Sequence, residues 1–163
     1  GQFRKVSGEP YLVHPQEVAG ILARYSYDDT QTQCVAYLHD LGEVRLGILR
    51  WIKRDFVDEI ASDVYDLSRN TIPREHRNTR LHPYNLRLLI SGRPRVLRVK
   101  IADNIHNTRD LRSLVLEGFM SFGEAEARVK EIREFYGPVG RAVDYRMVEE
   151  LERNIEDYED SVS

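Results

Sequence analysis

A histidine, an aspartate and a glutamate close the stretch Cys34-Val-Ala-Tyr-Leu-His-Asp-Leu-Gly-Glu43. Its apolar first half predicts a buried helix that ends at His39 and Asp40, with Gly42 as the terminating signal. Burying an imidazole and carboxylates in such a place is costly unless something compensates their polarity, and a divalent cation is the usual compensation. The stretch therefore predicts one part of a metal site, with Glu43 close enough to move a proton.

A second histidine precedes a proline near the start of the chain. Pro15 disfavours a helical conformation at His14 but suits the first turn of a helix, so we expect a helix from Pro15 to about Tyr25. His14 would then stand just outside the helix N-terminus, at a constrained corner. That position could present its ring to a neighbouring site.

A carboxylate also lies inside the apolar run Val99-Lys-Ile-Ala-Asp-Asn-Ile-His-Asn107. Lys100, Asp103 and Asn107 are spaced by three and four residues, which places them on one face of a helix. Lys100 is a candidate for substrate binding, with a pairing to a structural carboxylate as the alternative. Asn107 could line the same site or hold the helix end.

Taken together, two histidines and two aspartates form a possible ligand set: His14, His39, Asp40 and Asp103. Mixed nitrogen and oxygen donors without sulfur suit manganese, iron or zinc better than calcium. Four protein ligands on a cation that accepts six would leave room for water and a substrate oxygen, and such a cation can polarise a phosphoryl group. The alternative is four unrelated structural residues, each satisfied by its own hydrogen bonds.

Helical periodicity dominates the remainder of the chain, and no alternation typical of a strand extends beyond a few residues. We predict an all-α fold, a bundle of about seven or eight helices in one domain over residues 1–163. Besides the segments above, a short apolar piece is expected at 46–52, and further helices are expected at 56–68, 74–90, 95–111, 121–135 and 138–157.

The composition is that of an ordinary globular protein, with 163 residues, 41% hydrophobic and 31% charged. Charges interrupt every apolar run, so we expect no membrane span, and the first residues lack the apolar core of a signal peptide. A net charge of −3 argues against a general nucleic-acid binder. The lone Cys34 cannot form an intramolecular disulfide, and we predict a cytoplasmic protein. The pattern leaves the oligomeric state open.

The order of these residues resembles the HD superfamily of metal-dependent phosphohydrolases. More narrowly, three segments resemble the hydrolase domain of the stringent-response enzymes that degrade guanosine tetra- and pentaphosphate, in their small, stand-alone form. These segments are Phe3-Arg-Lys-Val-Ser-Gly-Glu-Pro-Tyr-Leu-Val-His-Pro15, Leu38-His-Asp-Leu-Gly-Glu43 and Val99-Lys-Ile-Ala-Asp-Asn-Ile-His-Asn107. The resemblance covers roughly the first two thirds of the chain and implies that the all-α bundle over residues 1–163 is a single HD-type phosphohydrolase domain.

The resemblance implies roles for individual residues. A manganese ion would be held by the four predicted ligands, Glu43 would assist catalysis together with Asn107, and an anionic nucleotide would be contacted by Arg4, Lys5, Lys100 and Asn107. The implied reaction is the attack of activated water on a 3'-pyrophosphate, which releases pyrophosphate.

One position departs from the family pattern. The family usually continues His-Asp-x-x-Glu-Asp, whereas Val44 stands here in the last position. A second acidic residue thought to help position water is therefore missing, and an HD phosphohydrolase for another nucleotide or phosphoester is an alternative. A further alternative is a non-catalytic helical binding module that keeps the metal site for stability.

Overall fold

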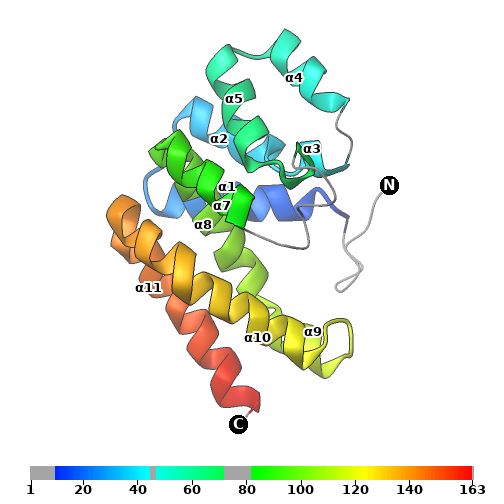
Figure 1. The fold of residues 1–163 in the computed structure, drawn as a ribbon, viewed down its shortest axis with the longest axis vertical. Coiled ribbons are helices and arrows are strands. Elements are labelled where there is room, and N and C mark those ends of the chain that lie inside the picture. Colours follow the sequence, from blue (N-terminus) through cyan, green and yellow to red (C-terminus); the bar gives the residue numbers. More distant parts are fainter. Residues whose placement is uncertain (1–9, 45–46, 72–81, 163) are drawn as a thin grey trace.

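The computed structural model describes residues 10–44, 47–71 and 82–162, and these ranges are helical and contain no β-strand. The all-α prediction is confirmed, and eight of the helices have eight or more residues. The elements (Figure 1) are α1 Val13–Arg24, α2 Thr30–Leu38, α3 Leu41–Val44, α4 Ile48–Asp55, α5 Asp58–Leu67, the 3-10 turn η1 Arg69–Thr71, α7 His82–Ser91, α8 Pro94–Arg109, α9 Leu111–Leu116, α10 Phe122–Glu131, the π-helical η2 Ile132–Tyr136 and α11 Gly137–Val162.

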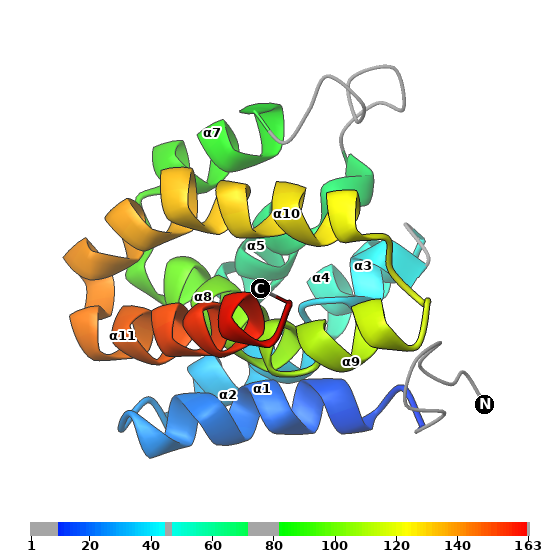
Figure 2. The ribbon, with the colours of Figure 1, turned by 90° about the horizontal axis from the view of Figure 1, so that it is seen from below.

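Helix α8 is the centre of the bundle. Eleven of its sixteen residues are buried, from Val96 to Thr108, which is the pattern of a helix covered on all sides. It packs against α1, α2, α5 and α11, most extensively against α11. Figure 2 shows α1 on one side of α8, and α7 and α10 on the other. A polar residue on α8 is therefore enclosed by the fold, and it needs a partner there.

Helix α1 begins earlier than expected. The prediction that His14 stands outside the helix is wrong, because α1 starts at Val13. The amide of Val13 donates to the Pro10 carbonyl at 3.0 Å, so a turn has already formed before Pro15 is reached. Pro15 remains in the first helical turn, where a missing N–H costs no intrahelical bond. His14 is thereby fixed on the helix rather than on a loose corner.

Gly42 does not end the helix that carries the His39–Asp40 pair. Helix α2 ends at Leu38, and Gly42 lies inside the short α3. A Cβ atom at Gly42 would come 2.0 Å from Oγ of Ser68, so the glycine is needed because α3 approaches the end of α5 closely. Glu43 is the next residue along α3.

The C-terminal part agrees with prediction in outline. Helix α10 begins at Phe122, and its N-cap residue Ser121 forms a capping box with Glu124. A break is expected between the helices at 121–135 and 138–157, but the π-helical η2 leads directly into α11. Helix α11 has a kink at Asp144, where φ is −161° and ψ is 105°. The Asp144 carboxylate accepts from the amide of Arg146 at 2.9 Å, as an N-cap does, so the helix resumes there.

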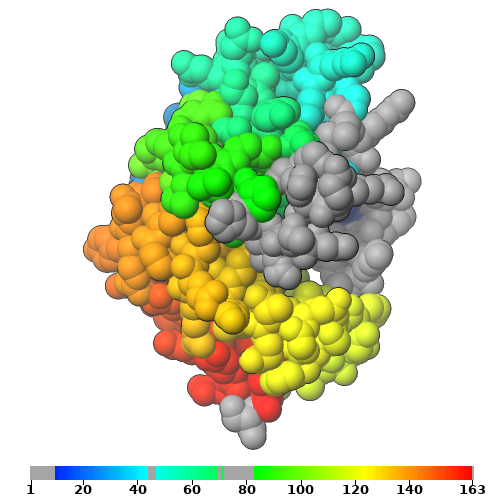
Figure 3. All heavy atoms as spheres, viewed as in Figure 1, coloured from blue at the N-terminus to red at the C-terminus, as the bar shows by residue number. Residues whose placement is uncertain are grey.

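Two other segments differ from prediction in extent. Of the apolar piece expected at 46–52, residues 48–52 belong to α4, which runs from Ile48 to Asp55. Residue 46 and part of the helix expected at 74–90 fall outside the described residues. In the space-filling view, α7 and the α10–η2 segment lie next to each other on one face (Figure 3), where the Tyr136 hydroxyl donates to Asn85. Within the described ranges, no helix is both long and apolar enough to span a bilayer.

Candidate metal centre

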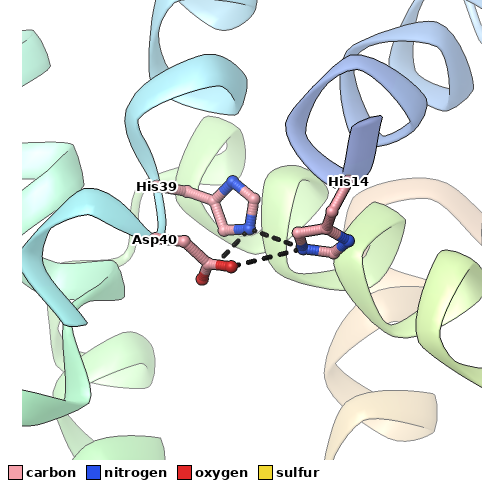
Figure 4. Close-up of side chains that lie close together, drawn as sticks. All are labelled: His14, His39 and Asp40. Carbon is pink, nitrogen blue, oxygen red and sulfur yellow. Dashed lines mark hydrogen bonds and ion pairs between the residues drawn. The ribbon is translucent and has the colours of Figure 1, made fainter. Parts of the chain in front are cut away.

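Four side chains from three parts of the chain meet beside α8. His14 Nε2 lies 3.2 Å from His39 Nε2, 3.2 Å from Asp103 Oδ1 and 3.4 Å from Asp40 Oδ2. His39 Nε2 lies 3.3 Å from Asp40 Oδ1 and 3.9 Å from Asp103 Oδ1. Figure 4 shows His14, His39 and Asp40 directed toward one another. The side chains of His14, His39 and Asp103 are buried, while Asp40 retains some exposure.

The end of α2 orients the His39 ring. His39 is the C-cap residue, and its Nδ1 lies 2.7 Å from the carbonyl oxygen of Ala36. A carbonyl can only accept, so Nδ1 carries the proton and Nε2 presents its lone pair to the cluster. Asp40 follows directly and is held by the Tyr11 hydroxyl, which donates to its Oδ2 at 2.7 Å.

Helix α8 supplies Asp103 already bonded on both oxygens. Lys100 Nζ lies 2.6 Å from Oδ2, and Asn107 Nδ2 donates to Oδ1, which is also the oxygen nearest the histidines. The three residues are one helical turn apart, as the predicted spacing of three and four requires. Oδ1 of Asp103 therefore faces the cluster, while Oδ2 is bonded to Lys100.

The carboxylates hold their charge in spite of burial. Burial raises the pKa of Asp40, but the attraction of His39 and His14 outweighs it and lowers that pKa to about 2. Burial likewise opposes the charge on Asp103, and Lys100 and His14 hold its pKa well below the usual range. Burial lowers the pKa of His14, yet Asp103 and Asp40 raise it to about 9. The two carboxylates thus favour positive charge beside them.

Glu43 lies at the edge of the cluster. Its amide donates to the Asp40 carbonyl at 2.9 Å, so α3 leads directly out of the site. The side chain is exposed, and Oε1 accepts from the backbone N–H of Arg69 at 3.3 Å. An exposed carboxylate that follows Asp40 by three residues is a candidate proton acceptor.

Comparison with known proteins agrees with this geometry. A family profile described as "HD domain" matches residues 1–118, about three quarters of the chain. The chain belongs to the HD domain family. This is a family of metal-dependent phosphohydrolases, so the chain is an enzyme of that class.

Similar curated proteins are named GTP pyrophosphokinases. This HD domain is 35% identical over 156 residues to GTP pyrophosphokinase rsh of Brucella ovis, covering 93% of the chain and 20% of that protein. It is 34% identical over 146 residues to GTP pyrophosphokinase of Myxococcus xanthus, covering 85% of the chain and 18% of that protein. The probable GTP pyrophosphokinase of Mycobacterium leprae is 35% identical over 116 residues, 69% of the chain and 14% of that protein. The chain therefore spans about a fifth of these relatives or less.

The clustered side chains of the HD domain are suited to a divalent cation. Ligands about 2.1 Å from an ion and adjacent around it lie roughly 3 Å apart. His14, His39 and Asp40 offer ligand atoms that all lie within 4.8 Å of one another, and Asp103 Oδ1 lies 3.2 Å from His14 Nε2. The donors are two imidazole nitrogens and two carboxylates, a set typical of manganese, iron or zinc.

The other predicted site residues divide into three groups. Asn107 and Lys100 both contact Asp103, and their predicted roles toward a substrate stay predictions. Glu43 is adjacent through α3. Arg4 and Lys5 lie outside the described residues, as does the side chain of Val44.

Two residues at the site were not predicted. Tyr11 bonds Asp40, and His106 lies against the far side of His14 with a 2.9 Å separation between the two Nδ1 atoms. The sequence held a signal for His106, because it lies three residues after Asp103 and shares a helix face with it. Tyr11 precedes α1, and its contact with Asp40 spans 29 residues, so local spacing does not identify it.

Proposed function

We propose that this HD domain hydrolyses guanosine 3',5'-bis(diphosphate) at its 3'-pyrophosphate and releases pyrophosphate, with manganese held by the four clustered residues. The observation that carries the proposal is the convergence of His14, His39, Asp40 and Asp103, with His14 Nε2 within 3.4 Å of the other three. When bound, a divalent cation would polarise a phosphoryl oxygen and make a water more nucleophilic.

The chain's own residues would supply the remaining chemistry. Glu43, exposed at the edge of the site, accepts the proton of the attacking water. Lys100 and Asn107 keep Asp103 oriented so that Oδ1 is presented to the cluster. Arg4 and Lys5 are proposed to neutralise the phosphates of the nucleotide, since paired cations are suited to phosphate recognition.

Two further observations support a guanine nucleotide as substrate. The relatives are named for a reaction that concerns GTP and pyrophosphate. The segments around His14, His39 and Asp103 also resemble, in order, those of hydrolases for guanosine tetraphosphate. The chain matches about a fifth of each relative, so the names of these relatives do not decide between hydrolysis and synthesis. We propose hydrolysis because of the residues at this site.

The decisive experiment is incubation of the purified protein with guanosine tetraphosphate and Mn²⁺. Guanosine diphosphate and pyrophosphate should appear, chelation with EDTA should stop the reaction, and added Mn²⁺ should restore it. Absence of both products under these conditions would contradict the proposal.

A matched pair of variants assigns the metal to the cluster. Asp103→Asn should weaken Mn²⁺ binding by more than about 100-fold. Mutating a residue that only hydrogen-bonds a metal ligand already lowers metal affinity about 10- to 100-fold. Asp144→Asn is the control: Asp144 is also a buried aspartate, but it bonds Tyr27 and Arg146 at the kink of α11. Equal Mn²⁺ affinity in the two variants would remove Asp103 from the metal site.

Val44 favours a second candidate, an HD phosphohydrolase for another nucleotide or phosphoester. A panel of nucleotides and phosphoesters tested at equal concentration distinguishes the two, because faster turnover of any other compound would favour this candidate. Val44→Asp restores the family's acidic residue and should raise kcat for guanosine tetraphosphate if the missing carboxylate limits the reaction. A non-catalytic module predicts no turnover in any of these assays.

A further inference from the structure

His14 and His106 face each other through the same ring atom. Their Nδ1 atoms are 2.9 Å apart, and their ring centroids are 4.8 Å apart with the planes tilted by 54°. Both side chains are buried, at 4% and 7% exposure. At this separation one nitrogen must carry a proton and the other must accept it, because neutral imidazole has one donor and one acceptor.

The other side of the His14 ring decides which nitrogen is which. Nε2 of His14 faces His39, Asp40 and Asp103 at 3.2–3.4 Å, so it is the atom that would bind a cation. A ligating nitrogen gives its lone pair and carries no proton. In that state His14 holds its proton on Nδ1, and Nδ1 of His106 must be the acceptor.

His39 provides a comparison within the same site. Its Nδ1 donates to the carbonyl of Ala36 at 2.7 Å, a partner that cannot be anything but an acceptor. His39 and His14 thus need the same tautomer to bind a cation through Nε2. For His39 the partner of Nδ1 is a backbone carbonyl, whereas for His14 it is the His106 side chain. Metal-binding histidines generally depend on such an acceptor for their tautomer and ring orientation.

We propose that His106 is a positioning residue that accepts the Nδ1 proton of His14 and thereby aims its Nε2 at the metal cluster. The inference rests on the proposed function in so far as it assumes a bound divalent cation. It assigns a role to His106 that does not require contact with the cation or the substrate. Since His106 lies three residues after Asp103, α8 supplies one ligand and the acceptor that orients another.

The test compares Mn²⁺ affinity in three variants by isothermal titration calorimetry on the metal-free protein. His106→Leu removes the acceptor and should raise the Kd for Mn²⁺ about 10- to 100-fold. His106→Asn should stay close to wild type, because Oδ1 of asparagine is as many bonds from Cα as Nδ1 of histidine. Thr108→Val is the control: it removes a buried hydroxyl of α8 that bonds Asn104 and Asn154 rather than His14, and it should leave the Kd unchanged.

A second measurement does not need a variant to fold. In the wild type loaded with Zn²⁺, which is diamagnetic, NMR of the imidazole nitrogens should place the His14 proton on Nδ1 in a slowly exchanging hydrogen bond. A proton absent from Nδ1, or wild-type Mn²⁺ affinity in His106→Leu, would overturn the role of His106. So would an asparagine variant as weak as the leucine variant, or a wild type that takes up neither Mn²⁺ nor Zn²⁺.

These outcomes separate the inference from the proposed reaction. If the protein leaves guanosine tetraphosphate intact but the Kd values follow the expected order, the proposed function fails and His106 keeps its role. If the protein hydrolyses the nucleotide and His106→Leu binds Mn²⁺ like the wild type, only the role of His106 fails.

Discussion

The ammonium group of Lys100 lies 2.6 Å from Oδ2 of Asp103, one turn away on α8, and both side chains are buried. Burial would lower the pKa of Lys100, but the Asp103 charge raises it above its usual value, so the pair is ionised. Two aromatic rings, those of Tyr84 and Tyr136, lie near Nζ at 5.9 Å from their centroids. The charge of a predicted metal ligand is therefore compensated within its own helix.

Lys100→Met is expected to destabilise the fold, because it leaves the Asp103 carboxylate buried without its cation. Loss of one partner from a buried pair costs about 3–5 kcal/mol. Urea denaturation of the metal-free protein measures the change. Saturating Mn²⁺ should recover part of the loss, since a bound cation replaces the missing charge.

Lys130→Met is the control for Lys100→Met. Its partner Glu134 is one turn away, and both side chains are about 70% exposed. Because an exposed ion pair contributes little to stability, Lys130→Met should keep the wild-type midpoint of urea denaturation within error. If the two variants lose the same stability, the buried pair has no special role in the fold.

Glu43→Gln should lower kcat for guanosine tetraphosphate by about 10²- to 10⁴-fold, the usual contribution of a positioned proton acceptor. The amide keeps the size of the side chain but cannot take a proton, so Mn²⁺ affinity should stay close to wild type. Steady-state kinetics and calorimetry test the two halves separately. Unchanged turnover in Glu43→Gln would exclude Glu43 as the catalytic base.

The clustering of His14, His39, Asp40 and Asp103 was predictable because each combines a residue type that can bind metal with local periodicity. His14 precedes a proline that suits the first turn of a helix, and Asp103 interrupts an apolar helix at a position its neighbours would bury. The all-helical fold followed from the same periodicity. These are local features, and local features are what a single sequence carries most directly.

The parts that were not predicted depend on contacts across the fold. Gly42 meets Ser68, 26 residues away, so the sequence offered only its common role as a helix terminator. His106 meets His14 across 92 residues, and an isolated histidine in a helix does not identify its partner. The kink at Asp144 likewise depends on Tyr27, whose hydroxyl donates to the Asp144 carboxylate.

Gly42→Ala should reduce turnover through the position of Glu43. The new Cβ would lie 2.0 Å from Ser68 Oγ and 2.8 Å from Ser68 Cβ, so α3 must move away from the end of α5. We expect a fall in kcat that is larger than any change in Mn²⁺ affinity, because Glu43 lies on α3 next to Gly42 while the four predicted ligands lie before α3 or on α1 and α8. Kinetics and calorimetry on the same preparation check this.

The matched control for Gly42→Ala is Gly20→Ala in α1. A Cβ at Gly20 meets nothing within 4 Å, and alanine favours a helix interior over glycine by roughly 0.5–1 kcal/mol. That variant should be stabilised and should keep wild-type kcat. Full activity in Gly42→Ala would show that the close approach to Ser68 does not place Glu43.

Glu150 on α11 should contribute a stability that is lost in acid. It accepts from Tyr25 at 2.6 Å, from Arg24 at 2.9 Å and from Arg109 at 2.7 Å, which joins α11 to α1 and α8. Burial raises the pKa of Glu150, but these hydrogen bonds outweigh burial and lower it from 4.5 to about 2. A carboxyl group with a lowered folded-state pKa stabilises above its unfolded pKa, and the contribution disappears as the pH falls from about 4.5 toward 2.

The comparison of wild type with Glu150→Gln by urea denaturation measures that contribution. The gap between their midpoints should be largest near pH 7 and should shrink through the window from about 4.5 down to 2. Glu134→Gln, which changes a largely exposed carboxylate, controls for the loss of a surface charge. A gap that is the same at about pH 3 as at pH 7 would mean that the Glu150 carboxylate is not what links α11 to α1 and α8.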